Sequence, residues 1–150
     1  MRPLLLSLAL VATACAPAQD AVADPDAIYT SWRNNVAAGG YDVVSYFSDA
    51  PLRGDKDYTY AWMGAEWRFA TEANRDLFAI NPQAFAPQYG GYCAWALAHD
   101  KLARGNPEHW RIEDGKLYLN FNDRVHRLWN EDRDALIARA DGHWPDVLDN

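Results

Sequence analysis

MGAEWRFATEANRDLFAINPQAFA, residues 63–86, aligns with DGKLYLNFNDRVHRLWNEDRDALI, residues 114–137, when the chain is shifted against itself by 51 residues. Three positions are identical in the two segments: Gly64, Leu77 and Ala84 fall on Gly115, Leu128 and Ala135. Each segment also has a turn, then a residue that can cap a helix, then a helical pattern. Such self-similarity predicts two copies of one structural unit. We therefore expect two hairpin-helix units that share one core.

The first unit is predicted to be an aromatic hairpin followed by a helix. YTYAWMGAEWRFA, residues 58–70, indicates two strands that meet at Met63-Gly64. Thr71 can cap the following helix, and Pro82 limits its length. We expect Leu77 and Phe78 of this helix to face inward.

The second unit repeats this order. HWRIEDGKLYLNFN, residues 109–122, predicts a hairpin, because Asp114-Gly115 favours a turn with both residues at positive φ. Alternating apolar residues are expected on one face of its second strand: Leu117, Leu119 and Phe121. Asn122 can cap a helix, and a further helix is expected to end near Gly142.

A short glycine-led helix is predicted between the two units. QYGGYCAWALAHD, residues 88–100, has helical composition after Gly90-Gly91 and contains the second cysteine of the chain, Cys93. The predicted fold is a small single α+β domain of two β-hairpin plus helix units with this helix between them.

The first residues predict export. Arg2 precedes an apolar run from Leu4 to Val11 that is too short to span a bilayer, which needs about 20 residues. Small residues before Cys15 resemble a bacterial lipobox, which implies a signal peptide 1–14 and lipidation of Cys15. Cleavage by the ordinary signal peptidase after Ala14 or Ala18 is the alternative. We expect a tether over 15–27 and a domain over 28–150. The protein is expected in the periplasm, anchored by lipid to the outer membrane, because Ala16 after the cysteine favours that location.

Composition narrows the range of partners. Hydrophobic residues make up 49% of the chain and aromatic residues 13%, as in globular proteins. The formal net charge of −7 leaves no basic patch for nucleic acid or anionic lipid, so the expected membrane contact is the N-terminal lipid alone. If Cys15 carries lipid or leaves with the signal peptide, Cys93 has no intramolecular disulfide partner.

Three segments together resemble the YHS domain family, in its stand-alone secreted branch. They are GGYDVVSYF (39–47), GAEWRFATEANRDLFAINPQAFAPQYGGYCAWA (64–96) and KLYLNFN (116–122), within a resemblance from about Gly39 to Pro145. The resemblance implies a small α+β fold and metal binding or metal handling. Metal-linked members carry cysteines at the positions of Ala70 and Asn74, so both ligand positions are empty here. Some secreted relatives carry selenocysteine at the position of Cys93, which implies chalcogen chemistry there.

Cys93 is the candidate functional residue, as nucleophile or metal ligand. If the helix starts near Gly91, Cys93 lies in its first turn, where unpaired N–H groups and the helix dipole favour a thiolate. We then expect partial exposure and a pKa below the unperturbed thiol value of about 8.5. Such a thiolate could hold copper or another soft metal ion. The alternative is an inert core cysteine, because Cys93, Ala96 and Leu97 form an apolar stripe.

Six residues are predicted to line a pocket beside Cys93: Tyr41, Asp42, Tyr89, Gly90, Gly91 and Tyr92. The family motif carries Tyr41 and Asp42, whose alternative roles are a packed ring and the cap of a short helix that runs through Tyr46. No two histidines have the spacing of a zinc site, and each is expected at the surface or at a cap.

Three functions stay open on the sequence alone. The first is an exported module that binds a soft metal or undergoes reversible oxidation through Cys93, and that serves a metal-handling or redox protein. The second is a thiol-dependent enzyme with Cys93 as its nucleophile. The third is a purely structural or protein-interaction domain.

Overall fold

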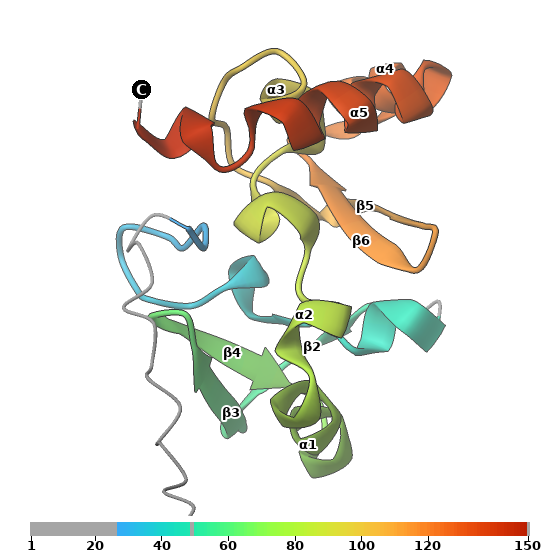
Figure 1. Cartoon of the computed structure of the whole chain (residues 1–150). Coiled ribbons are helices and arrows are strands. Elements are labelled where there is room, and N and C mark those ends of the chain that lie inside the picture. Colours follow the sequence, from blue (N-terminus) through green and yellow to red (C-terminus); the bar gives the residue numbers. More distant parts are fainter. Residues whose placement is uncertain (1–26, 49, 150) are drawn as a thin grey trace, which may run out of the picture.

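The computed structural model describes residues 27–48 and 50–149, which form three two-stranded antiparallel sheets interleaved with helices (Figure 1). In chain order the elements are η1 (Ala38–Gly40), β1 (Tyr41–Asp42), η2 (Ser45–Ser48), β2 (Leu52–Arg53), β3 (Asp55–Trp62), β4 (Ala65–Phe69), α1 (Glu72–Ile80), α2 (Pro82–Phe85), η3 (Gln88–Gly91), α3 (Ala94–Leu97), β5 (Asn106–Glu113), β6 (Lys116–Asn120), α4 (Asp123–Glu131), α5 (Arg133–His143) and η4 (Asp146–Asp149). The predicted signal peptide, Cys15 and the tether up to residue 26 lie outside the described residues. Within the described part, no helix is both long enough and apolar enough to span a bilayer.

The two long hairpins repeat each other with a shift of 51 residues. Tyr60 pairs with Trp67 in β3–β4, and Arg111 pairs with Tyr118 in β5–β6. The register of each ladder also breaks at the same place, between Asp55 and Thr59 in the first hairpin and between Asn106 and Trp110 in the second. Figure 1 shows the first unit (β3, β4, α1, α2) in the lower half and the second (β5, β6, α4, α5) in the upper half. The predicted pair of hairpin-helix units is confirmed.

Both hairpin turns have two successive residues at positive φ, which the sequence predicts for Asp114-Gly115. Met63 and Gly64 have φ values of 48° and 75°, and Asp114 and Gly115 have 49° and 71°. Two successive residues at positive φ give a turn whose twist matches that of the flanking strands. Met63 adopts this backbone although it is not glycine, so the strand pairing holds it in the left-handed region.

The helix starts and stops are repeated too. The Thr71 hydroxyl accepts a hydrogen bond from the Asn74 N–H at 3.1 Å, and the Asn122 side chain accepts one from the Val125 N–H at 2.9 Å. Both predicted caps are confirmed, and each satisfies an N–H that the helix cannot pair internally. Pro82 is the first residue of α2, where its missing N–H costs nothing, so α1 ends before it.

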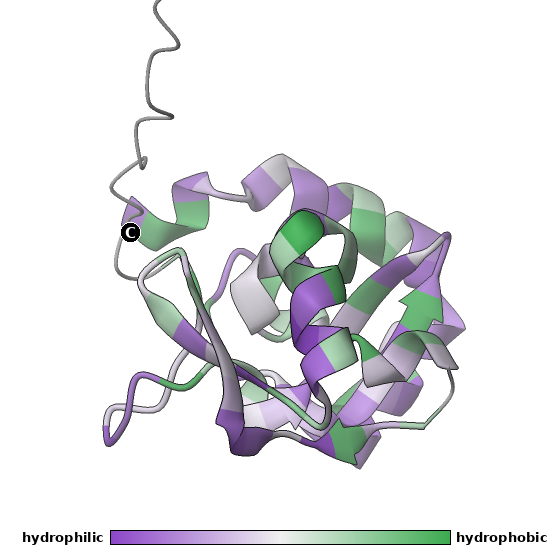
Figure 2. Ribbon diagram, turned by 90° about the horizontal axis from the view of Figure 1, so that it is seen from below, coloured by the Kyte–Doolittle hydropathy of each residue, from purple (hydrophilic) through white to green (hydrophobic). Residues whose placement is uncertain are grey.

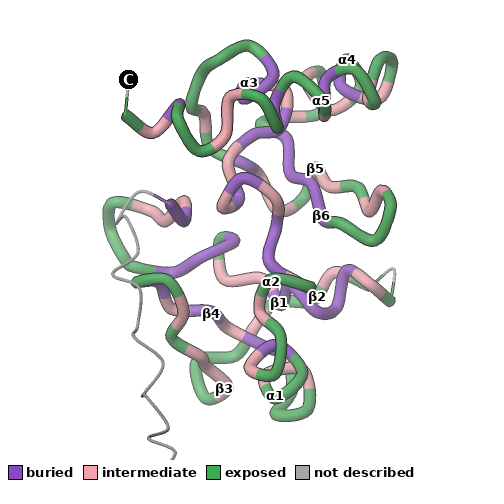
Figure 3. The backbone as a smooth tube through the Cα atoms, viewed as in Figure 1, coloured by how far each residue is buried: buried purple, intermediate pink, exposed green. Residues whose placement is uncertain are grey.

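Strand β6 lies between two hydrophobic clusters. Leu117 and Leu119 belong to the cluster built around the first unit, whereas Tyr118 belongs to the cluster of the second unit. Both faces of β6 are therefore buried, as its colour in Figure 3 shows. The predicted alternation holds for the two leucines but fails at Phe121, which lies beyond the end of β6 and is 37% exposed.

The prediction that Leu77 of α1 faces inward is wrong. Phe78 is completely buried, but its neighbour Leu77 is 48% exposed. Successive helix residues point about 100° apart, so a short helix on one face of a core buries one of the two deeply. The equivalent pair in α4 behaves alike, with Trp129 buried and Leu128 37% exposed. Figure 2 shows that hydrophobic residues (green) and hydrophilic residues (purple) are interspersed along the helices.

Candidate functional site

Cys93 immediately precedes α3 and acts as its N-cap residue. Its backbone is extended, with φ −65° and ψ 116°, so it stands one step before the first helical turn in which it was expected. The preceding residues Tyr89, Gly90 and Gly91 all have positive φ and redirect the chain into α3. The Cys93 N–H donates to the Ala103 carbonyl at 2.9 Å, which fixes the backbone on its other side.

The Cys93 sulfur is buried among backbone donors. Only 1% of the residue is exposed, so the expectation of partial exposure is wrong. Burial raises the pKa of the Cys93 thiol, and this outweighs the nearby backbone N–H groups of Ala96, Phe121 and Trp95, which act to lower the pKa. The expected low pKa is therefore wrong as well, since desolvation exceeds the stabilisation from the helix start.

Asn120 connects Cys93 to a histidine. The amide oxygen of this fully buried residue lies 3.7 Å from the Cys93 sulfur and also accepts the Trp95 N–H at 3.2 Å. Its amide nitrogen lies 3.5 Å from Nδ1 of His126. Because the Trp95 N–H fixes the amide oxygen toward the sulfur, Asn120 accepts from the neutral thiol. Burial, and secondarily the neighbouring His109, lowers the pKa of His126.

Asp42 occupies in the first unit the place that Cys93 occupies in the second. Its carboxyl accepts the N–H groups of Val44, Ser45 and Ala70 at 2.9, 3.2 and 2.9 Å. The 51-residue shift carries these three donor positions onto Trp95, Ala96 and Phe121, whose backbone N–H groups lie near the Cys93 sulfur and act to lower its pKa. The thiol therefore lies in a backbone site that, in the other unit, holds a carboxyl group.

A sequence signal for this equivalence lies N-terminal to each of the two repeated hairpins. GGYD, residues 39–42, falls on GGYC, residues 90–93, at the same shift. The positive φ values of Ala38, Gly39 and Gly40 (48°, 58° and 79°) match those of residues 89–91 (56°, 61° and 89°). The repeat thus extends N-terminally from the hairpins to the glycine pairs.

The two sites differ in their remaining contacts. The Asp42 carboxyl also accepts the side-chain amide of Asn74 at 2.7 Å, whereas the equivalent residue in the second unit is the apolar Val125. A cavity of about 250 Å³ opens beside the thiol instead. Its lining is apolar except for one lysine: Cys93, Trp95, Ala96, Lys101, Leu102, Ala103, Phe121 and Val125. This cavity offers space for a small apolar molecule next to the buried Cys93.

The residues predicted to surround Cys93 are distributed elsewhere, and none of the six lines this cavity. Asp42 caps η2 in the first unit, as one of its predicted roles required. The Tyr41 hydroxyl lies 3.2 Å from Glu108, and the Arg53 guanidinium stacks on its ring at 4.2 Å.

The tyrosines beside the second glycine pair pack against the C-terminal part of the chain. The Tyr89 hydroxyl donates to Asp141 at 2.8 Å, and its ring lies 6.1 Å from that of Trp144. Tyr92 packs between Tyr29 and Trp144, and Gly90 lines a separate cavity with Trp144. Gly91 is buried, and Pro87 and Leu119 lie closest to where its side chain would be.

Metal ligands do not gather at Cys93. In the part of the chain that the structure describes, no three His, Cys, Asp or Glu side chains lie close enough to hold a metal ion. Ala70 and Asn74, where the metal-linked YHS members carry cysteines, contact Asp42 rather than Cys93. The copper site at Cys93 stays a prediction.

No family model, curated protein or solved structure matches the chain. Its resemblance to the YHS domain family therefore also stays a prediction.

Proposed function

We propose that this protein is an exported thiol-redox module in which Cys93 is reversibly oxidised by small, uncharged hydroperoxides. One observation carries the proposal: the Cys93 sulfur lies where the other unit accommodates a carboxyl group, and the backbone N–H groups of the three equivalent positions lie near it and favour its charged form. Donors so arranged stabilise negative charge, which the sulfur carries as a thiolate and shares with oxygen as a sulfenate.

In the proposed step the Cys93 thiolate attacks the outer oxygen of a hydroperoxide, ROOH. A sulfur–oxygen bond forms and the oxygen–oxygen bond breaks, so the sulfur is oxidised to sulfenic acid and the peroxide is reduced. The proton that leaves the thiol ends on the departing oxygen, which gives the alcohol ROH. Asn120, which accepts from the neutral thiol, is placed to receive a hydrogen bond from the sulfenic acid afterwards.

Reduction of Cys93 requires a thiol from another molecule. Cys93 is the free cysteine among the described residues, so the second thiol is assigned to a redox partner protein. Attack by that thiol on the sulfenic acid forms a mixed disulfide and water, and a further thiol of the partner then releases Cys93. The apolar cavity favours a hydroperoxide with an apolar body over a charged oxidant.

Thiol chemistry is favoured over metal binding because of the donor set. The side-chain acceptor beside the sulfur is the amide oxygen of Asn120, a hard ligand that suits soft metals poorly. The raised pKa keeps Cys93 as a neutral thiol near neutrality, so oxidation should accelerate as the pH rises.

The test is oxidation of the folded protein by cumene hydroperoxide, followed at the Cys93 peptide by mass spectrometry and trapped with a sulfenic-acid reagent. We expect one oxygen atom added at Cys93, a rate that still increases above pH of about 8.5, and no adduct in Cys93→Ser. If the folded protein resists oxidation while the unfolded chain reacts, Cys93 is an inert core residue and the thiol-redox function is refuted. The structural or protein-interaction domain would then be the favoured function. Copper(I) that protects Cys93 stoichiometrically would favour the metal-binding function instead.

A further inference from the structure

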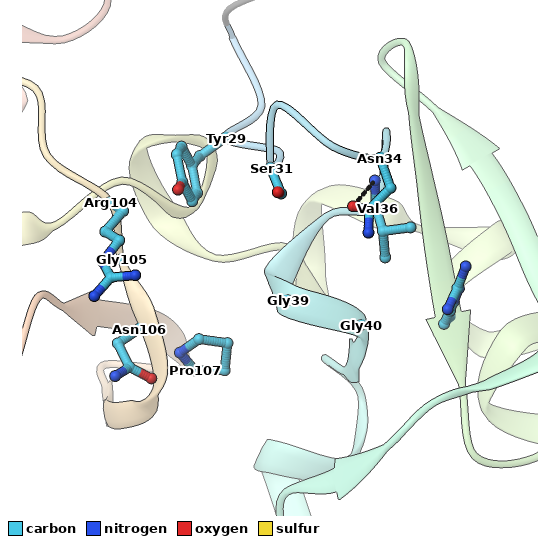
Figure 4. Close-up of a pocket in the computed structure, with 11 residues that line it drawn as sticks. Tyr29, Ser31, Asn34, Val36, Gly39, Gly40, Arg104, Gly105, Asn106 and Pro107 are labelled. Atoms are coloured by element: carbon cyan, nitrogen blue, oxygen red, sulfur yellow. Dashed lines mark hydrogen bonds between the residues drawn. The ribbon is translucent and has the colours of Figure 1, made fainter.

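A second cavity, of about 400 Å³, is lined by residues from both units. Figure 4 shows Tyr29, Arg104 and Asn106 on one side, Asn34 and Val36 on the opposite side, and Gly39 between them. This cavity and the cavity beside Cys93 share no lining residue, although Arg104 of this one packs on Phe121 of the other.

The charge of this cavity is opposite to that of the protein. The chain has 21 acidic and 14 basic residues, yet the cavity is lined by Arg68 and Arg104 and by no Asp or Glu. Arg68 shares part of its charge with Glu66, whose carboxylate lies 2.7 Å from the Arg68 Nε. Within residues 27–48 and 50–149, Arg104 has no carboxylate partner, and its guanidinium is held at 5.1 Å over the Phe121 ring.

The neutral groups of the cavity are hydrogen-bond donors as well. The side-chain oxygen of Asn34 accepts the Val36 N–H at 3.4 Å, and that of Asn106 accepts the Glu108 N–H at 3.0 Å. Since both oxygens are occupied, the NH₂ groups of the two amides remain to donate. The Tyr29 hydroxyl adds a further donor.

Apolar groups complete the lining. The Val36 side chain and the Pro107 ring face the cavity together with the Tyr29 ring (Figure 4). A site with convergent donors and apolar walls, of this volume, suits a small organic molecule better than a bare inorganic ion.

From these contacts we propose that the cavity binds a small organic carboxylate, with the Arg104 guanidinium on the carboxylate and the apolar body against Val36, Pro107 and the Tyr29 ring. A planar guanidinium can pair with a carboxylate through two parallel hydrogen bonds, which an ammonium cannot do. The site is independent of the proposed thiol chemistry.

The experiment titrates the full chain with benzoate and with its neutral analogue benzamide, using two-dimensional amide NMR. We expect benzoate to shift the signals of Gly39, Gly40 and Gly105, and benzamide to bind more weakly by about tenfold or more, since a hydrogen bond to a charged group is worth about 1.5–3 kcal/mol. Arg104→Gln should lose a similar factor, and Arg104→Lys should recover only part of it.

Arg124→Gln is the matched control, because it removes the same charge from an exposed position on α4 that lies outside the cavity. It should leave benzoate binding unchanged. Equal binding of benzoate and benzamide, unchanged affinity in Arg104→Gln, or loss of affinity in both glutamine variants would overturn the proposal. Inorganic phosphate that competes fully with benzoate would also overturn it, since the site would then select charge without the apolar body. Arg68→Gln tests the second arginine of the cavity, which belongs to the other unit. It should weaken benzoate binding less than Arg104→Gln does, because Arg68 is already paired with Glu66.

Discussion

Replacing Cys93 with Asp and Val125 with Asn would transfer the hydrogen-bonding set of Asp42 into the second unit. Asp42 is held by three backbone N–H groups and by the amide of Asn74, at distances between 2.7 and 3.2 Å. The second unit already supplies the three backbone donors, and Val125 stands at the position of Asn74. The double variant therefore rebuilds the complete set.

Each single substitution should destabilise the protein. Cys93→Asp places a carboxylate beside the Asn120 oxygen without its fourth donor, and a buried polar group left incompletely paired costs about 1–3 kcal/mol. Val125→Asn places an amide in an apolar cavity and should cost a similar amount, about 1–3 kcal/mol. Together the two side chains can form a charged hydrogen bond, so we expect a favourable coupling free energy of about 1.5–3 kcal/mol.

The assay is a double-mutant cycle by urea unfolding at neutral pH. The seven tryptophans, of which Trp67 and Trp129 are buried, provide the fluorescence signal. The coupling is the unfolding free energy of the double variant compared with the sum of the two single effects. A coupling near zero, or an unfavourable one, would refute the equivalence of the Asp42 and Cys93 sites.

Two further predictions concern the core and the buried tyrosines. Phe78→Ala should lower the free energy of unfolding by about 3–5 kcal/mol, and Leu77→Ala by less than about 1 kcal/mol, because only Phe78 is completely buried; equal losses in urea unfolding would contradict this. Burial raises the pKa of Tyr46 and Tyr89, and raises that of Tyr118 to about 12. Since these folded pKa values exceed the unfolded value of about 10, their stabilising contribution is full below pH about 10 and is lost as the pH rises through the folded values. Ultraviolet absorbance should show these phenols ionising later than the exposed tyrosines, and a single transition near the unperturbed value, without unfolding, would be the contrary result.

The features predicted correctly from the sequence are those that local chemistry determines. The Asp114-Gly115 turn depends on two adjacent residues, and the caps at Thr71 and Asn122 each depend on one side chain and an N–H three residues later. The α+β fold followed from these signals, because each recurs at the same shift.

The features missed depend on contacts between distant segments. Whether Leu77 is buried depends on which side of α1 packs on the core, and the periodicity of so short a helix does not fix it. In the sequence Asn120 is one polar residue in an apolar strand. Its contacts with Cys93 and His126 form only when β6 packs against α3 and α4. The burial of Cys93 also depends on chain far from α3, notably the segment around Phe121.

Asp42 and Cys93 have equivalent backbone N–H donors around them but different side chains. The same three donor positions surround both residues, so the backbone arrangement does not require a thiol: a carboxyl group satisfies it. A hydrogen-bonded cap would explain Asp42 completely, yet a thiol is a poor substitute for that purpose, because sulfur is a weak acceptor. In the second unit Val125 also removes the fourth donor, and a cavity opens at the sulfur. These changes remove the capping contacts that the first unit makes and leave the thiol beside an apolar cavity, which is why we propose the function for the second copy of the unit.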